Sequence, residues 1–109
     1  MSPATTNRRG QTRFKASLAV TDGRHATTTR DLSPDGMFVR GLSYAVGERV
    51  GLLVQFPDRP VPMRVAADVV RTDAAQGGVG LKLLHSSQAQ RIALSAAIVR
   101  LAWAKTEPP

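Results

Sequence analysis

Residues 14–23 read FKASLAVTDG, and this stretch decides the fold class of the chain. Apolar side chains fill every second position, at Phe14, Ala16, Leu18 and Val20. An alternation of period two predicts a strand with one buried face. The Asp22-Gly23 pair that follows predicts a two-residue hairpin turn, because such a turn needs positive φ.

The same alternation recurs along the chain. We expect a threonine-rich strand over residues 24–30 and a short strand over residues 36–40. Three longer patterns follow, over residues 50–56, 61–71 and 79–83, the second of which loses its alternation after residue 69. Six strands on short connections predict an all-β domain, in which an antiparallel sheet curls into a six-stranded β-barrel and so hides its edges.

One helix is predicted after the strands. Ser87 and Gln90 form a capping-box pattern, in which Ser87 is the N-cap and Gln90 reaches back to it. The helix should run from about Gln88 to about Ala104. Its apolar residues fall into two stripes: Leu94, Ala97, Ile98 and Leu101 in one, and Ile92, Ala96, Val99 and Trp103 in the other. One stripe can cover the barrel. The second is either enclosed by the same domain or binds a second copy in a homodimer, and the sequence leaves both open.

The composition excludes several classes of protein. The chain has 109 residues, 42% of them hydrophobic, which fits one globular domain. It contains no cysteine, so it has neither disulfides nor thiolate metal sites. His25 and His85 lie apart from other ligating residues, and no paired carboxylates suggest catalysis, so we expect no metal, no cofactor and no enzyme. No signal peptide and no apolar run of the ~20 residues that span a membrane is present, so the expected location is cytoplasmic.

The first residues of the chain are basic. Residues 8–13 read RRGQTR, and no acidic residue precedes Asp22. The net charge of +7 favours an anionic partner. A guanidinium suits phosphate and the N7/O6 edge of guanine, because its planar fork donates two parallel hydrogen bonds. On its own, however, the stretch also fits a solvated, flexible arm.

A second motif, further along the chain, indicates a function for the basic N-terminal residues. Arg9 and Arg13 form RxxxR ahead of the strands, and Asp31, Ser33 and Gly36 form DxSxxG after the second predicted strand. Residues 33–36, SPDG, also predict a tight turn. In this order and spacing the two motifs resemble the signature of the PilZ domain family, RxxxR followed by (D/N)xSxxG. The GVGLKL strand at residues 78–83 and the closing helix are similar to that family as well.

The resemblance implies a PilZ-like split barrel that acts as a bacterial receptor for cyclic di-GMP, a ring with two phosphates and two guanines. Arg9 and Arg13 can then reach a phosphate or a guanine Hoogsteen edge. Asp31 can accept from guanine N1–H and N2–H, which adenine does not offer. Ser33 can donate to a phosphate or guanine acceptor, and Gly36 lets the backbone come close.

Two further residues bear on the ligand. In the family, an arginine at the position of Arg8 goes with two intercalated cyclic di-GMP molecules, so the resemblance implies two ligands in each domain. Arg71 is a weaker candidate for stacking on a base, because a salt bridge or solvent would also satisfy it. Gly77-Gly78-Val79-Gly80 leads into a strand and not into a helix N-terminus, so no dinucleotide site is expected there.

The expected organisation is a flexible basic arm over residues 1–13, a β-barrel over 14–85 and a C-terminal helix over 86–105, with one PilZ domain spanning 7–104. The expected function is a receptor that changes conformation on binding cyclic di-GMP and signals to a downstream protein. One alternative is a protein-interaction adaptor of the same fold that needs no ligand. Another is a basic barrel that binds single-stranded nucleic acid, although the exposed aromatic residues typical of such barrels are missing from the pattern.

Overall fold

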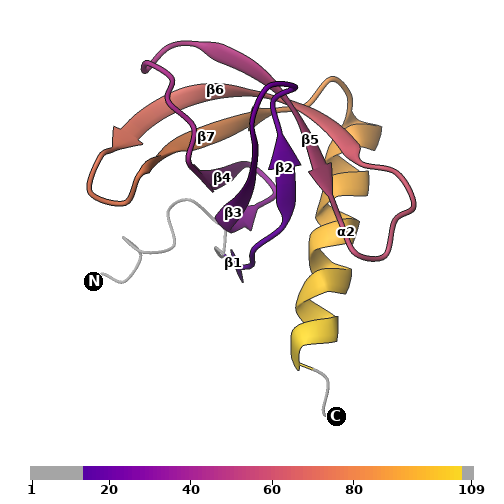
Figure 1. The fold of residues 1–109 in the computed structure, drawn as a ribbon. Helices are drawn as coiled ribbons and strands as arrows, with labels where there is room; N and C mark the ends of the chain where they lie inside the picture. Colours follow the sequence, from indigo (N-terminus) through magenta and orange to yellow (C-terminus); the bar gives the residue numbers. More distant parts are fainter. Residues whose placement is uncertain (1–13, 107–109) are drawn as a thin grey trace, which may run out of the picture.

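The computed structural model describes residues 14–106, and for residues 104–106 it describes the backbone. Within this part of the chain lie seven strands and one helix, shown in Figure 1. They are β1 (Phe14–Lys15), β2 (Ala19–Thr21), β3 (Ala26–Ser33), β4 (Gly36–Arg40), β5 (Arg49–Gln55), β6 (Met63–Asp73), β7 (Gly78–Leu84) and α2 (Gln88–Thr106).

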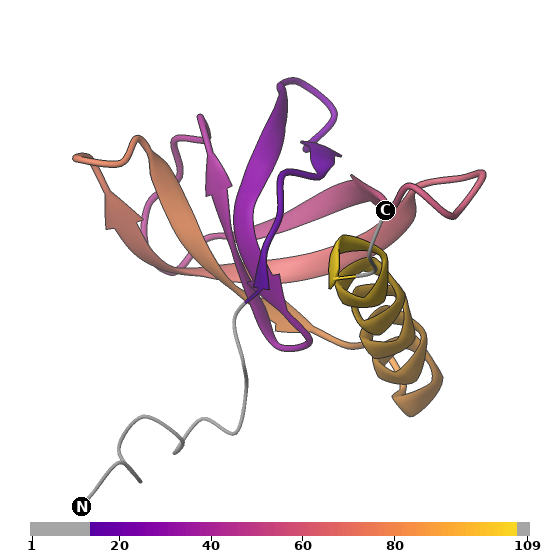
Figure 2. The same ribbon diagram turned by 90° about the horizontal axis from the view of Figure 1, so that it is seen from below.

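Six of the strands close into an antiparallel barrel. The order around the ring is β3-β2-β5-β6-β7-β4, and β4 pairs with β3 to complete it. The short β1 pairs with the end of β3 and extends the sheet. Figures 1 and 2 show α2 against one side of the barrel and the loop between β6 and β7 on the opposite side. The prediction of a six-stranded barrel with a C-terminal helix is confirmed.

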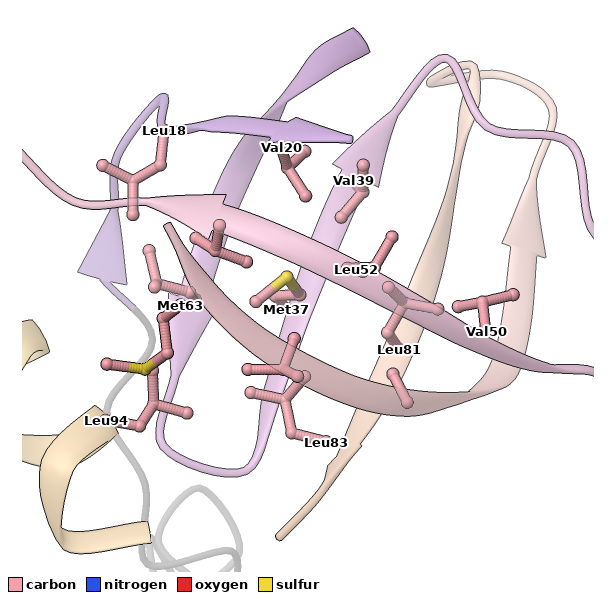
Figure 3. Close-up of a cluster of buried hydrophobic side chains, with 14 of the residues drawn as sticks. Leu18, Val20, Met37, Val39, Val50, Leu52, Met63, Leu81, Leu83 and Leu94 are labelled. Atoms are coloured by element: carbon pink, nitrogen blue, oxygen red, sulfur yellow. The ribbon is translucent and has the colours of Figure 1, made fainter. Parts of the chain in front are cut away.

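The barrel encloses a continuous apolar core. Alternate residues of β5 point inward, with Leu52 only 2% exposed and Val54 fully buried. Leu94 of α2 is also fully buried, and Figure 3 shows it next to Met63 at the edge of this core. The burial of a leucine side chain contributes roughly 1.5–3 kcal/mol, so this contact is a main anchor of the helix.

The predicted first strand, residues 14–20, is divided in the structure. Phe14 pairs with Leu32, but Ala19 pairs with Thr28, so the register shifts by one residue between β1 and β2. The Thr29 hydroxyl bridges the gap, since it donates to the Ala16 carbonyl oxygen at 2.6 Å and accepts from the Leu18 amide at 3.0 Å. A buried threonine therefore satisfies the backbone groups that the interrupted ladder leaves over.

The predicted hairpin between β2 and β3 is present, but its centre lies one residue later. The Asp22 amide donates to the His25 carbonyl oxygen, so Gly23 and Arg24 are the central residues, and Gly23 has a φ of 97°. The Asp22 carboxylate accepts from the amides of Arg24 and His25 and from the Tyr44 hydroxyl at 2.5 Å. These donors, the hydroxyl above all, lower the pKa of Asp22 well below its ordinary value.

The helix prediction is confirmed with two corrections. α2 continues to Thr106, and Ser87 caps it by accepting from the Gln90 amide at 3.1 Å. The Gln90 side chain, however, accepts from the Ser86 amide and not from that of Ser87. The stripe that includes Leu94, Ala97 and Ile98 is buried, whereas large residues of the second stripe are exposed. The reading in which the domain encloses the whole helix is therefore wrong.

Candidate functional site

The DxSxxG residues lie at the β3–β4 hairpin. Residues 31–33 belong to β3, so this strand ends three residues later than the predicted end at Arg30. Ser33 pairs with Gly36 across the turn, so Pro34 and Asp35 are its central residues, and the tight turn predicted at residues 33–36 is confirmed. Asp31 and Ser33 flank Leu32, which belongs to the core. Because side chains alternate along a strand, Asp31 and Ser33 both lie on the outer face of the barrel.

Two β-bulges shape this outer face. The pairing of β3 with β4 skips Arg30, and the pairing of β6 with β7 skips Val70. After these bulges, Asp31 lies opposite Phe38, and Arg71 lies opposite Gly80. A bulge inserts one residue and re-aims the neighbouring side chains, and both bulges direct an arginine towards the same ring.

Phe38 is that ring. It is fully buried although it lies between the core residues Met37 and Val39 and so points out of the barrel. The guanidinium carbon of Arg30 lies 4.1 Å from the centre of the Phe38 ring, and that of Arg71 lies 5.3 Å from it. Two cations therefore cover one aromatic ring on the barrel surface.

Glycines on β7 make room for this arrangement. A Cβ atom at Gly80 would lie 2.9 Å from Cγ of Arg71, and a Cβ atom at Gly78 would lie 2.7 Å from Cε1 of Phe38. Arg71 also approaches Asp73, with Nη1 at 3.6 Å from Oδ2. The glycines of β7 thus leave room for the Phe38 ring and for Arg71. Arg71 both stacks on this ring and pairs with Asp73, and a salt bridge was one of the two alternatives to base stacking that the sequence offered for it.

A pocket of about 640 Å³ opens beside Asp31 and Arg30. Its lining residues come from β1, the β1–β2 segment, β3, β4 and the β6–β7 loop: Lys15, Ala16, Ser17, Arg30, Asp31, Arg40 and Gln76. The volume lies in the range of small-molecule sites, roughly 300–1,000 Å³. Three of the seven lining side chains are cationic and one is anionic, which favours an anionic ligand.

Arg30 organises this pocket. Its Nε donates to Asp31 Oδ2 at 2.8 Å, and its Nη1 donates to the Gln76 side-chain oxygen. Asp31 is 6% exposed, so its carboxylate is fixed at the pocket wall. One guanidinium thereby holds the carboxylate, the loop glutamine and, by stacking, the ring of Phe38 in one arrangement.

Ser33 and Gly36 face each other across the β3–β4 ladder, two residues along from the Asp31–Phe38 pair. Ser33 is 2% exposed, and its hydroxyl donates to the Gly36 carbonyl oxygen over 3.5 Å, which is at the limit of a hydrogen bond. Gly36 also pairs with Lys82 of β7, so a cationic residue lies next to Gly36 in the sheet. Gly36 is a strand residue outside the left-handed region of φ, so close approach of the backbone is the property that a glycine would supply here.

The β3–β4 turn is also tied to the helix. The Arg91 guanidinium of α2 donates to both carboxylate oxygens of Asp35, at 3.2 and 2.9 Å. His85 Nε2 donates to the Pro34 carbonyl oxygen at 2.8 Å, and the Leu83 amide donates to the Asp35 carbonyl oxygen at 2.9 Å. The hydrogen bonds from Arg91 lower the pKa of the Asp35 carboxyl. The turn that bears the motif is thus connected directly to the start of α2.

The three arginines of the predicted site, Arg8, Arg9 and Arg13, lie outside the described residues. Arg13 directly precedes Phe14, which begins β1, and Lys15 of β1 lines the pocket. Of the six predicted site residues, the structure therefore brings together Asp31, Ser33 and Gly36 at one corner of the barrel.

The sequence matches the family profile described as PilZ domain over residues 6–100. The chain belongs to the PilZ domain family. No curated protein matches it closely enough to count as a relative.

Solved structures with this PilZ fold include three similar chains. The Bacillus subtilis inhibitor of motility (MotI/DgrA) has 24% identity and a TM-score of 0.67, over 90% of this chain and 52% of that one. An uncharacterized Legionella protein has 14% identity and a TM-score of 0.70, over 88% and 99%. The PilZ domain of YcgR from Escherichia coli, solved with c-di-GMP, has 15% identity and a TM-score of 0.61, over 90% and 96%. This chain thus spans about half of the length of the first of these.

Sequence reasoning missed Arg30, Phe38 and the function of the two glycines at this PilZ barrel face. A signal was present for Phe38, since the alternation that buries Met37 and Val39 turns Phe38 outward. Among residues 14–106 no helix is long and apolar enough to cross a membrane, and no group of His, Asp and Glu could hold a metal ion.

Proposed function

We propose that this PilZ protein is a receptor for cyclic di-GMP that binds its ligand without catalysing a reaction. The observation that carries the proposal is the position of the motif residues. Asp31 and Ser33 share the outer barrel face, and Asp31 forms the wall of a 640 Å³ pocket that also contains Lys15, Arg30 and Arg40.

The chemistry of the pocket supports a guanine dinucleotide. The cations can neutralise two phosphates, and a guanidinium can also donate to the N7 and O6 atoms of guanine. A carboxylate can accept from guanine N1–H and N2–H, and Arg30 holds Asp31 in a fixed position for this contact. Adenine offers no such pair of donors, so Asp31 is the residue that would distinguish cyclic di-GMP from cyclic di-AMP.

We infer that the RxxxR segment completes the site. Only Phe14 separates Arg13 from Lys15, which lines the pocket, so the segment begins within reach of a bound ligand. Arg9 and Arg13 would then bind the phosphates or guanine edges from the side opposite Asp31. Arg8, by the family pattern, would favour two intercalated ligand molecules.

The β3–β4 turn would transmit ligand binding from the pocket to helix α2. Asp35 follows the motif serine by two residues and is bound by Arg91 of α2. A ligand that moves this turn would shift the start of α2 and change the surface that a downstream protein meets. This receptor would act in the cytoplasm, where nucleotide second messengers are made.

Isothermal titration calorimetry tests the proposal. We expect saturable heat with cyclic di-GMP and none with cyclic di-AMP at the same concentrations. Replacing Asp31 with alanine should weaken binding by ~30-fold or more, because a hydrogen-bonded charge contributes about 2 kcal/mol or more. The control is Asp58→Ala, which removes an exposed carboxylate beside α2 and should bind like the wild type.

Two outcomes would refute the proposal. Equal binding heats for cyclic di-GMP and cyclic di-AMP would show that Asp31 does not recognise guanine. The absence of heat and of thermal stabilisation with cyclic di-GMP would remove the receptor function altogether. Replacing Arg8 with leucine tests the number of ligands separately: a change in stoichiometry from two to one supports the intercalated pair, and unchanged stoichiometry contradicts it.

A further inference from the structure

Helix α2 carries an apolar face that the barrel does not cover. Ile92 is 59% exposed, Val99 is 55% exposed and Trp103 is 70% exposed. The opposite face, with Leu94 and Ala97 fully buried, already anchors the helix to the core. The exposed face is therefore not needed to attach the helix to its own domain.

The spacing of this face is that of a coiled-coil seam. Ala89, Ile92, Ala96, Val99 and Trp103 follow one another at steps of three, four, three and four residues. Such steps average 3.5 residues, which is the a/d repeat that packs one helix against another helix. We call these five residues the α2 seam.

The charges beside the seam are neutralised within the chain. Residues 88–103 contain only two charged side chains, Arg91 and Arg100. Arg91 is paired with Asp35 at 2.9 Å, and Arg100 is paired with Asp58 at 2.5 Å. Although the protein carries a net charge of +7, this face lacks the excess of positive charge that would repel an identical surface.

We infer that the α2 seam binds the α2 seam of a second copy of this chain, in an antiparallel pair. With the twofold axis between Ala96 and Val99, Ala96 of each copy faces Val99 of the other, and Trp103 faces Ile92, so seam residues meet seam residues at every level. In a parallel pair Trp103 would meet Trp103, and Ala89 would meet Ala89. The antiparallel pair avoids the contact between two tryptophans and spreads large and small side chains more evenly, and the opposed helix dipoles favour it as well.

The expected dimer is weak and depends on concentration. A helix of 19 residues is about 28 Å long. One pair of such helices buries less surface than a standard interface of roughly 1,600 Å². The inference does not depend on the proposed ligand, and its test needs none.

Sedimentation velocity on the full chain, from about 1 µM to about 1 mM, measures the association. Trp103 is the only tryptophan, so its fluorescence emission should shift to shorter wavelength as the dimer forms. Val99→Glu should weaken association by at least tenfold and abolish the shift. The matched control is Val46→Glu, at a 62% exposed valine of the β4–β5 loop, and should associate like the wild type.

Engineered cysteines test the orientation, because the chain has none of its own. Under oxidation a mixture of the Ala96→Cys and Val99→Cys proteins should form the cross-linked heterodimer, and Ala89→Cys should not cross-link to itself, since antiparallel helices bring position 96 of one copy opposite position 99 of the other. A wild-type protein that sediments as a monomer at every concentration would overturn the inference. So would a Val99→Glu variant that is folded by circular dichroism and associates normally. Cross-linking through Ala89→Cys would overturn the antiparallel arrangement.

Discussion

Replacement of Gly78 with alanine should strongly destabilise the barrel, although Gly78 lies on a strand and not in a turn. A Cβ atom there would lie 2.3 Å from the Val39 carbonyl oxygen and 2.7 Å from Phe38 Cε1, whereas real Cβ contacts essentially never fall below 3.0 Å. β4 and β7 must therefore move apart by about 0.7 Å next to Gly78, or the buried Phe38 ring must leave its site.

The cost follows from these contacts. Overpacking of a buried site costs about 1–3 kcal/mol, and the weakened ladder hydrogen bonds between β4 and β7 add about 1 kcal/mol. A loss of about 3 kcal/mol in the free energy of unfolding should lower the Tm by roughly 15 °C. Differential scanning calorimetry measures both quantities.

Gly80→Ala is the matched control for this variant. Its Cβ atom would meet only the side chain of Arg71, at 2.9 Å from Cγ, and this half-exposed side chain can move aside. We expect a loss below about 1 kcal/mol. Equal stability of the Gly78→Ala protein and the wild type, or equal losses in the two variants, would refute this explanation of the glycine-rich strand.

Three further predictions concern other parts of the molecule. Tyr44→Phe removes a hydrogen bond to the Asp22 carboxylate and should lower the free energy of unfolding by about 1–3 kcal/mol near pH 7. Because the folded-state pKa of Asp22 is lowered, this advantage of the wild type is present above aspartate's ordinary pKa of 3.8 and shrinks as the pH falls below it. Urea unfolding of both proteins at several pH values will check this. Leu94→Ala should cost about 2–5 kcal/mol by thermal unfolding, and Ile92→Ala, at an exposed site of the same helix, less than about 1 kcal/mol; similar losses would contradict the assignment of the two helix faces. Arg30→Lys keeps the charge but loses the planar fork, so calorimetry should show cyclic di-GMP binding about tenfold weaker at unchanged stoichiometry, and unchanged affinity would exclude a role for that fork.

The barrel could be predicted from the sequence because each strand has one inner and one outer face. Alternation fixes which residues of β5 and β7 point inward. It does not place Asp31 and Ser33, because the predicted strand ends at Arg30, and only the pairing with β4 carries β3 on to Ser33. Ser87 could be identified as the N-cap because capping is local, involving an amide only three residues away.

The surface of the site could not be predicted in the same way. The bulges at Arg30 and Val70 arise from the register between strands far apart in the sequence. The burial of Phe38 depends on Arg71 of β6 and on glycines of β7, so no local pattern reveals it. Likewise, two apolar stripes on one helix do not indicate which of them meets the barrel; only the packing of Leu94 decides this.

The central claim is that the RxxxR segment and the β3–β4 corner bind one and the same ligand. The most direct measurement is an NMR titration of isotope-labelled protein with cyclic di-GMP, following the backbone amides of residues 8–13 and 30–36 together. We predict that both sets shift along one saturation curve with a common midpoint and stoichiometry. Shifts confined to one of the two segments, or two separate midpoints, would contradict the claim.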